Sequence, residues 1–265
     1  MYRGFNLVLS FTDEDLFQKG RTLNAQNKLK VKNTLNDFIA PDGSLNGSEI
    51  QRNWFSQLDA DVFISHSHKD EKVAITLVGW LLENFGIKAF ADSCIWGYSN
   101  DLLKMIDNKY CLNPNGTSYN YLKRNFSTSH VHIMLTTALN MMIDKTECLF
   151  FLNTPNSITA SDVVFKTESP WIYSEIAISQ MICRKIPQRR EIHEKQYFYK
   201  GGELNESLKV KYELNLAHLS EITKDNMVIW AVLYKLKKKF YDAGLALDCL
   251  YELNPPKDLN VYKKL

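Results

Sequence analysis

Apolar residues with the spacing of strands and helices begin to recur at Asp61. Residues 62–64 form a short β-rich run, and the apolar positions of residues 73–85 repeat at the spacing of one helix face. Gly86 is the residue type that commonly ends a helix, and residues 87–91 form a second strand-like run. A strand, a helix and a strand in this order predict parallel pairing through a right-handed crossover.

The same pattern extends into the second half of the chain. Residues 148–152 have the composition of a buried strand. Ser169-Pro170 predicts a helix start, because serine caps helices and proline fits their first position. We expect a last strand within residues 210–216 and a final helix over residues 224–243. The alternation predicts an α/β fold, with a flavodoxin-like, doubly wound parallel sheet that helices cover on both faces.

Three stretches outside this pattern are expected to be additions to one main domain. Residues 1–57 are polar and turn-rich and predict an N-terminal helical appendage. Residues 111–128 are rich in Asn, Tyr, Ser and Gly and predict an inserted loop, followed by a helix from about residue 130 to 143. Residues 246–265 are expected to form a C-terminal tail, so that the main domain covers residues 58–245.

Composition and charge exclude several classes of partner. The formal net charge is +2, from 32 basic and 30 acidic side chains, and the lysines around residue 237 are typical of a solvated helix face, so we expect no nucleic-acid partner. No stretch approaches the roughly 20 apolar residues of a membrane span, and the N-terminal residues lack the pattern of a signal peptide. The five cysteines are scattered without a disulfide or metal spacing. We therefore expect a cytoplasmic protein with reduced thiols and no membrane partner.

Polar residues follow each of the three clear strands. In open parallel α/β sheets, ligands bind outside the carboxyl ends of the strands. The polar residues expected at that edge are Ser65, His66, Asp92, Ser93 and Asn153.

Trp171 and Glu175 lie four residues apart on the helix after the third strand, so they share one helix face. By itself this spacing is more typical of a buried tryptophan and an ordinary surface glutamate. The context is more specific, because residues 61–70 (DVFISHSHKD) resemble the opening strand and loop of TIR (Toll/interleukin-1 receptor) domains. Residues 86–92 resemble their second strand, and Trp171-x-x-x-Glu175 matches the W-x-x-x-E motif of TIR domains that hydrolyse NAD+. The resemblance covers about residues 61–184.

The resemblance implies an enzyme that cleaves the nicotinamide–ribose bond of NAD+, giving nicotinamide and either ADP-ribose or a cyclic ADP-ribose signal. NAD+ is then the substrate, and no cofactor or metal is expected. Glu175 would be the catalytic residue, and residues 93–100 would form a self-association loop. The residues expected to bind substrate, with Trp96 completing a neighbour's site, are Phe63, Ser65, His66, Asp92, Ser93, Trp96 and Trp171.

The resemblance also implies a biological setting, because many bacterial TIR enzymes act in antiphage defence, such as the Thoeris systems. We therefore expect a phage-derived trigger and a downstream effector that reads the nucleotide signal.

The chemistry agrees with this expectation. Cleaving the nicotinamide–ribose bond develops positive charge on the ribose, as in glycoside hydrolysis. An ionised carboxylate beneath the sugar stabilises that charge as it appears. The helix N-terminus modestly favours the ionised form of Glu175, although this effect fades beyond the first turn. Nicotinamide leaves without a strong general acid, because breaking the bond neutralises its ring nitrogen.

Three other functions agree with parts of the pattern. A non-enzymatic TIR domain would be an oligomerisation or adaptor module, and the carboxylate of Glu175 argues against it. Nucleoside deoxyribosyltransferase-like enzymes share the fold and a glutamate, and also act on a glycosidic bond. His66-x-His68 and His130-x-His132 are candidate metal pairs, but residues two apart on a helix point in different directions, and no accompanying set has zinc spacing.

Overall fold

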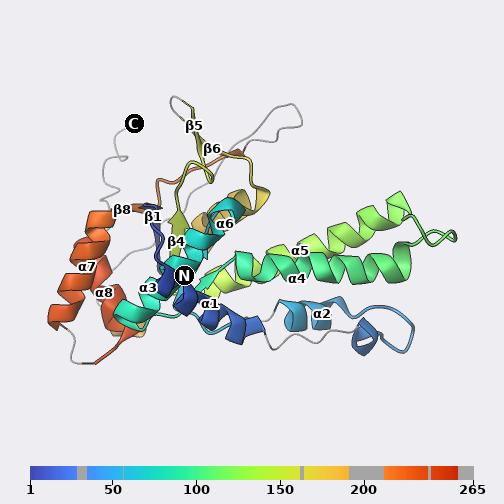
Figure 1. The fold of residues 1–265 in the computed structure, drawn as a ribbon, viewed down its shortest axis with the longest axis horizontal. Helices are drawn as coiled ribbons and strands as arrows, with labels where there is room; N and C mark the ends of the chain where they lie inside the picture. Colours follow the sequence, from blue (N-terminus) through green and yellow to red (C-terminus); the bar gives the residue numbers. More distant parts are fainter. Residues whose placement is uncertain (29–34, 56, 162–163, 191–211, 238–239, 256–265) are drawn as a thin grey trace.

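A five-stranded parallel sheet forms the centre of the molecule, with the strand order β3-β2-β4-β1-β8 (Figure 1). The computed structural model describes residues 1–28, 35–55, 57–161, 164–190, 212–237 and 240–255. The strands of this sheet are β1 (Arg3–Val8), β2 (Val62–Ser65), β3 (Ala89–Ala91), β4 (Cys148–Leu152) and β8 (Ser220–Thr223).

Helices cover both faces of the sheet, which confirms the expected α/β class. The helices whose residues join the first core are α1 (Glu14–Lys28), α3 (Glu71–Phe85), α7 (Lys224–Lys237) and α8 (Ala243–Leu253). The helices whose residues join the second core are α2 (Gly47–Trp54), α4 (Ser93–Ile106), α5 (Tyr121–Lys145) and α6 (Pro170–Met181).

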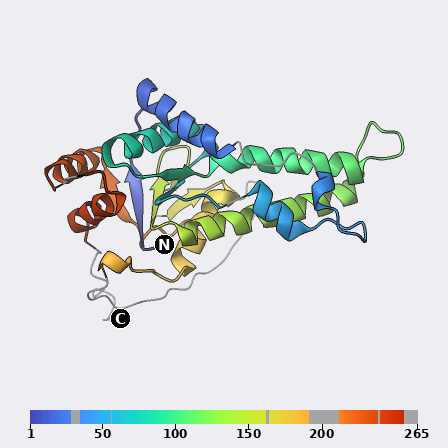
Figure 2. The same cartoon turned by 90° about the horizontal axis from the view of Figure 1, so that it is seen from below.

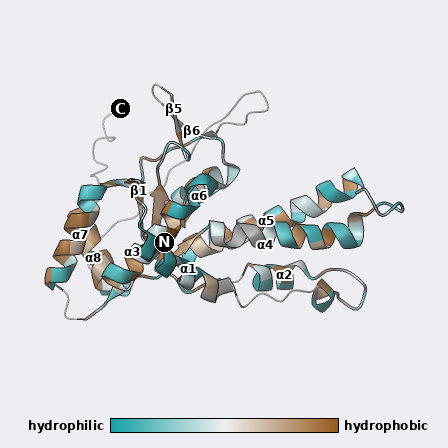
Figure 3. Ribbon diagram, in the orientation of Figure 1, coloured by the Kyte–Doolittle hydropathy of each residue, from teal (hydrophilic) through white to brown (hydrophobic). Residues whose placement is uncertain are grey.

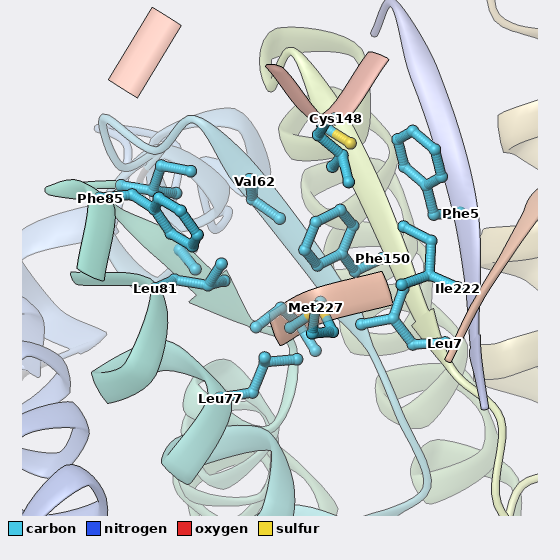
Figure 4. Close-up of a cluster of buried hydrophobic side chains, with 14 of the residues drawn as sticks. Phe5, Leu7, Val62, Leu77, Leu81, Phe85, Cys148, Phe150, Ile222 and Met227 are labelled. Atoms are coloured by element: carbon cyan, nitrogen blue, oxygen red, sulfur yellow. The ribbon is translucent and has the colours of Figure 1, made fainter. Parts of the chain in front are cut away.

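The two cores follow from alternation along the strands. On β4, Phe150 belongs to the first core and Leu149 to the second, because successive strand side chains point to opposite faces. Figure 4 shows Phe150 among buried side chains of the first core, with Phe5 and Leu7 of β1 on one side and Leu81 of α3 on the other. In Figure 3 the central strand β4 is brown, the colour of hydrophobic residues, whereas the surrounding helices carry both brown and teal residues.

Local signals set the ends of the predicted helices. Gly86 adopts φ of 70°, a left-handed conformation that glycine tolerates, and ends α3. The side chain of Ser169 accepts a hydrogen bond from the backbone N–H of Ile172 at 3.3 Å, and Pro170 is the first residue of α6. These findings confirm the helices predicted after the first and third sequence-predicted strands.

The prediction of an N-terminal helical appendage over residues 1–57 is confirmed for its helices, α1 and α2, but is wrong for Arg3–Val8, which form a strand of the sheet. β1 lies between β4 and β8 and pairs in parallel with both, with Phe5 opposite Phe150 and Ser220. When strands are counted from β2, the order β3-β2-β4 reads 2-1-3, which is the start of the flavodoxin-like order. The next position in the sheet is occupied by β1, the first strand of the chain. The start of the chain is therefore part of the sheet.

Residues 93–100 and 111–128 were expected to be loops, and this prediction is wrong for most of them. Residues 93–106 form α4, Asp107–Cys111 form one π-helical turn, and α5 already begins at Tyr121. The side chain of Asn120 caps α5 by accepting from the N–H of Lys123 at 3.0 Å. Helix propensity is only a weak prior, and here the capping and the pairing of α4 with α5 override the polar composition.

Helices α4 and α5 form a helical hairpin that extends beyond the sheet in both views (Figures 1 and 2). Inside this hairpin the buried carboxylate of Asp107 accepts from Arg124 at 2.8 Å and from Ser127. The large apolar side chains that are most exposed on α5 are Tyr121, Leu122, Phe126 and Ile133.

The C-terminal predictions also need correction. The predicted helix over residues 224–243 is present as α7 over Lys224–Lys237, and residues 238–239 lie outside the described part. Residues 243–253, which were assigned to the end of the main domain and to the tail, form α8, which buries Leu247 and Leu250 in the first core. Residues 256–265 lie outside the described part. Of the strand expected within residues 210–216, Tyr212–Glu213 form β7 of a small antiparallel sheet, which also contains β5 (Thr159–Ser161) and β6 (Val164–Thr167).

Helices α1 and α3 cross with their backbones in contact. A Cβ atom added to Gly79 would lie 1.9 Å from the carbonyl oxygen of Leu16, and one added to Gly20 would lie 2.1 Å from that of Ile75. Such short distances to backbone atoms require the helices to move apart. The crossing therefore depends on glycine at both positions.

We expect Gly79→Ala to lower the free energy of unfolding by about 1–3 kcal/mol, the usual cost of overpacking. Gly47→Ala is the matched control, because an added Cβ there meets only the flexible end of Met134 at 3.1 Å. Denaturant unfolding of the two variants measures the difference. Equal stability of both variants and the wild type would contradict the tight crossing.

Candidate active site

Four polar side chains meet in the interior at the carboxyl ends of the strands. Ser65 is the last residue of β2 and His66 follows it, Asp92 follows β3, and Glu175 projects from α6. Ser65, His66 and Asp92 are 0% exposed and Glu175 is 1% exposed. We call these four residues the carboxyl–histidine cluster. The sequence analysis expected them at one site, and the structure brings them together.

Packing directs Glu175 inward. Ile172 and Ile176 lie on the same side of α6 and are buried in the second core, so Glu175 between them is carried toward the sheet. The common expectation for such a glutamate, a surface side chain, is therefore wrong. The carboxyl group points toward the strand ends and is enclosed by protein.

The contacts within the carboxyl–histidine cluster are close. Nδ1 of His66 lies 2.6 Å from Oδ1 of Asp92. The Ser65 hydroxyl and the Asp92 carboxyl are close enough to Glu175 to shift its pKa, but neither makes a hydrogen bond of ordinary geometry with it. Buried carboxyl oxygens without a hydrogen-bond partner lower the stability of the fold unless a proton or a ligand binds them.

Burial raises the pKa of both carboxyl groups. The pKa of Asp92 is raised to about 8, mainly because the group loses its hydration, while contact with Glu175 and the amides of Ser93 and His66 lower it only in part. The pKa of Glu175 is raised well above its ordinary value, first by burial and then by the negative charge of Asp92. The pair therefore holds at least one proton at neutral pH.

Burial also lowers the pKa of His66, so its ring is neutral at physiological pH. The helix dipole was expected to favour an ionised Glu175. That expectation is wrong for the enclosed state, because Glu175 lies beyond the first turn of α6, where the dipole effect has faded, and desolvation dominates.

The remaining predicted residues have separate surroundings. Phe63 is fully buried in the second core, 5.5 Å from the ring of Phe90, which gives it a packing role. Trp171 makes an edge contact at 5.5 Å with His132 of α5. Ser93 is the first residue of α4 and half-buried, beside Asp92. The backbone of Trp96 lies in α4, but its side chain is outside the described part of the structure.

Sequence reasoning missed a polar link beside the carboxyl–histidine cluster. The buried carboxylate of Asp70 accepts a hydrogen bond from the Thr154 hydroxyl at 2.5 Å and one from Asn156 Nδ2 at 2.8 Å. Asp70 occupies the N-cap position of α3, but its side chain makes no capping hydrogen bond there. The polar residues directly after the third predicted strand were the sequence signal that could have revealed this link. The sequence analysis had selected Asn153 at this position, and its backbone N–H donates a hydrogen bond to the carbonyl oxygen of Leu7.

The two members of the candidate metal pair His130-x-His132 contact different neighbours. His130 contacts the ring of Phe126, whereas His132 contacts Trp171. Among the residues that the structure describes, no group of three or more His, Cys, Asp or Glu side chains could hold a metal ion. Within that same part of the chain, none of the helices combines the length and the apolar character needed to span a bilayer.

No family model, curated protein or solved structure matches the chain. The fold and the site therefore define only a class: an α/β protein with a parallel five-stranded sheet and a buried cluster of two carboxyl groups and a histidine at the strand carboxyl ends.

We predict that stability falls as pH rises above about 5, because Asp92 and Glu175 keep protons in the folded state that the unfolded chain has lost. Their folded pKa values are raised, to about 8 for Asp92, so their contribution is complete below the unfolded values of about 4 and is lost progressively as pH rises through each raised folded pKa. The expected slope is about 1.4 kcal/mol per pH unit for each proton retained.

Glu175→Gln should make this slope shallower, whereas Glu49→Gln, a change at an exposed residue of α2, should leave it unchanged. Denaturant unfolding at several pH values between 5 and 8 measures the slopes. Parallel curves for wild type and Glu175→Gln would show that Glu175 is not protonated in the fold.

Proposed function

We propose that the chain is a TIR-like NAD+ nucleosidase, with Glu175 as the catalytic carboxylate. One observation carries the proposal: Glu175 of the W-x-x-x-E spacing lies with Ser65, His66 and Asp92 at the carboxyl ends of parallel strands. A residue chosen for its motif thus lies at the edge where open α/β sheets bind ligands. The flavodoxin-like TIR assignment of the fold is part of this proposal.

The reaction breaks the bond between the ribose and the cationic nicotinamide ring. The bonding electron pair leaves with nicotinamide, whose ring nitrogen becomes neutral, and the ribose becomes oxocarbenium-like. The ionised Glu175 stabilises that positive charge. Attack by water gives ADP-ribose and releases a proton, whereas attack by a nucleophilic group of the same molecule gives a cyclic ADP-ribose product.

Substrate must open the enclosed site to reach Glu175. Ser65 and His66 at the end of β2, with Asp92 and Ser93 between β3 and α4, would then line one side of the dinucleotide. Trp171 lies one helical turn before Glu175 and would shape the entrance. NAD+ brings a positive charge, which favours ionisation of a carboxyl group that burial otherwise keeps neutral.

The wider setting belongs to the same proposal. A phage-derived trigger and an effector that reads the nucleotide product would place the enzyme in cytoplasmic antiphage defence. Self-association would involve residues 93–100, which form the start of α4 and thus present a helix rather than a loop.

A second candidate function is favoured by the protonated carboxyl pair. A neutral nucleoside needs a general acid to protonate its leaving base, unlike NAD+. The raised pKa of Asp92, about 8, keeps such an acid available at neutral pH. Glycosyl transfer from nucleosides, as in deoxyribosyltransferase-like enzymes, is therefore the alternative to test.

We expect Glu175→Gln to reduce nicotinamide release from NAD+ by about three orders of magnitude or more, because it removes the only full negative charge proposed to face the ribose. Glu168→Gln is the matched control, since this exposed glutamate lies just before the same helix, and it should keep wild-type activity. Chromatography of the products with NAD+ and a crowding agent measures the rates and separates linear from cyclic ADP-ribose.

A nucleoside panel under the same conditions distinguishes the alternatives. Base release from nucleosides with NAD+ left intact would favour the transferase. If crowded wild-type protein forms oligomers but cleaves neither substrate, the enzymatic proposal is wrong and the adaptor function is favoured.

A further inference from the structure

The outer side of α5 carries large apolar side chains. Leu122, Phe126 and Ile133 are 75%, 70% and 68% exposed. At 3.6 residues per turn they lie within about 40° of one another around the helix axis. The opposite side of the helix, with Val131 and Leu135, is buried in the second core. Helix α5 therefore has two apolar sides, and the described part of the chain covers only one of them.

The exposed side of α5 also lacks charge. From Asn125 to Ile143 the helix contains no Asp, Glu, Lys or Arg residue, whereas the solvent side of a surface helix normally carries charged groups. Exposed aromatic and aliphatic side chains without charge are typical of the core of an interface rather than of a solvated face. We use the name α5 strip for the exposed residues on this side, which are Leu122, Phe126, Ser129, His130, Ile133 and Thr137.

Neighbouring helices contact the flanks of α5 and leave the α5 strip open. On one flank Gln51 of α2 donates a hydrogen bond to Sδ of Met141 at 3.7 Å. On the other flank His132 makes its edge contact with Trp171 of α6. The α5 strip runs between these two contacts. Because the helical hairpin extends beyond the sheet, the strip is accessible to a partner (Figures 1 and 2).

The size of the α5 strip fits an interface with one further protein molecule. Phe126 and the neighbouring Tyr121, which is 76% exposed, offer on the order of 300 Å². The other residues of the strip bring this surface to roughly 600–700 Å². A specific interface buries about 600–1,000 Å² on each partner. The strip is therefore large enough for a small, specific interface.

A second copy of the chain is the partner that this surface fits. Two neutral strips meet without like-charge repulsion, and a charged partner gains no ion pair there. If a two-fold axis passes between Ser129 and His130, antiparallel strips place Phe126 of each copy against Ile133 of the other. Ser129 is small, so the two helices can approach closely at the axis. The dipoles of the two helices then point in opposite directions, which is the favourable arrangement.

We propose that two copies of the chain associate through antiparallel packing of their α5 strips. This dimer goes beyond the proposed function and does not depend on it. It also uses a different helix from residues 93–100, the self-association segment that the family resemblance implies.

The first test compares two leucines of equal exposure. Sedimentation equilibrium of the full chain between about 1 and 100 μM measures the dissociation constant of the dimer. Leu122→Lys should weaken the dimer at least tenfold, because it places a charge in an apolar interface. Leu236→Lys is the matched control, since Leu236 is 77% exposed but lies on α7, and it should keep the wild-type constant.

The second test examines the antiparallel pairing. Phe126→Lys and Ile133→Glu should each weaken the dimer at least tenfold. A variant that carries both changes should regain much of the lost affinity, because opposite charges then face each other across the axis. Residues seven apart are not neighbours on one helix, so this recovery requires the second copy. Denaturant unfolding should show near wild-type stability for every variant, because the changes are at exposed positions.

Three results would overturn the proposed dimer. The first is a wild-type chain that stays monomeric at about 100 μM. The second is a dimer that Leu122→Lys weakens no more than Leu236→Lys does. The third is a double variant that associates no more tightly than Phe126→Lys or Ile133→Glu alone, which contradicts the antiparallel pairing. None of these results depends on whether the chain cleaves NAD+.

Discussion

The arrangement of the molecule depends most on how two carboxyl groups are kept in its interior. Asp92 and Glu175 meet where almost no water reaches them, beside a neutral His66. Such burial is tolerated because the pair retains a proton and His66 contacts Asp92 at 2.6 Å. A protein that needed only stability would place apolar residues there, so the buried carboxyl groups indicate a function that uses them.

The sheet determines where these groups can meet. Parallel strands bring their carboxyl ends to one edge, and β2 and β3 are neighbours, so His66 and Asp92 follow adjacent strands. Helix α6 then brings Glu175 to the same edge through the burial of Ile172 and Ile176 in the second core. The polar link from Asp70 to Thr154 joins the end of β4 to the connection after β2, which ties the surrounding loops together.

The helical hairpin and the N-terminal strand are the two features of this fold that the predicted flavodoxin-like sheet did not include. α5 has 25 residues and is therefore roughly 37 Å long, which carries it past the sheet edge. Asp107, buried between the hairpin helices, joins them through Arg124 and Ser127. At the other side of the sheet, β1 and β8 extend the surface that α7 and α8 cover, so both ends of the chain complete the first core.

The sequence by itself determined the elements whose signals are local. The short apolar β-rich runs, the glycine at position 86 and the Ser169-Pro170 start are local signals of side-chain type, backbone sterics and capping, and the strands and helices they predict are present. Ser65, His66 and Asp92 were expected together from strand direction, whereas Glu175 joined them through the resemblance to the W-x-x-x-E motif. The structure brings the four side chains together.

Only the tertiary structure decided the rest. Phe5 and Leu7 alternate over too few residues to predict that β1 lies between β4 and β8, since strand pairing is a long-range choice. The polar residues 111–128 are partly helical because α4 packs beside α5. The protonation of Glu175 depends on how completely other segments enclose it, and that enclosure is a property of packing that no local pattern contains.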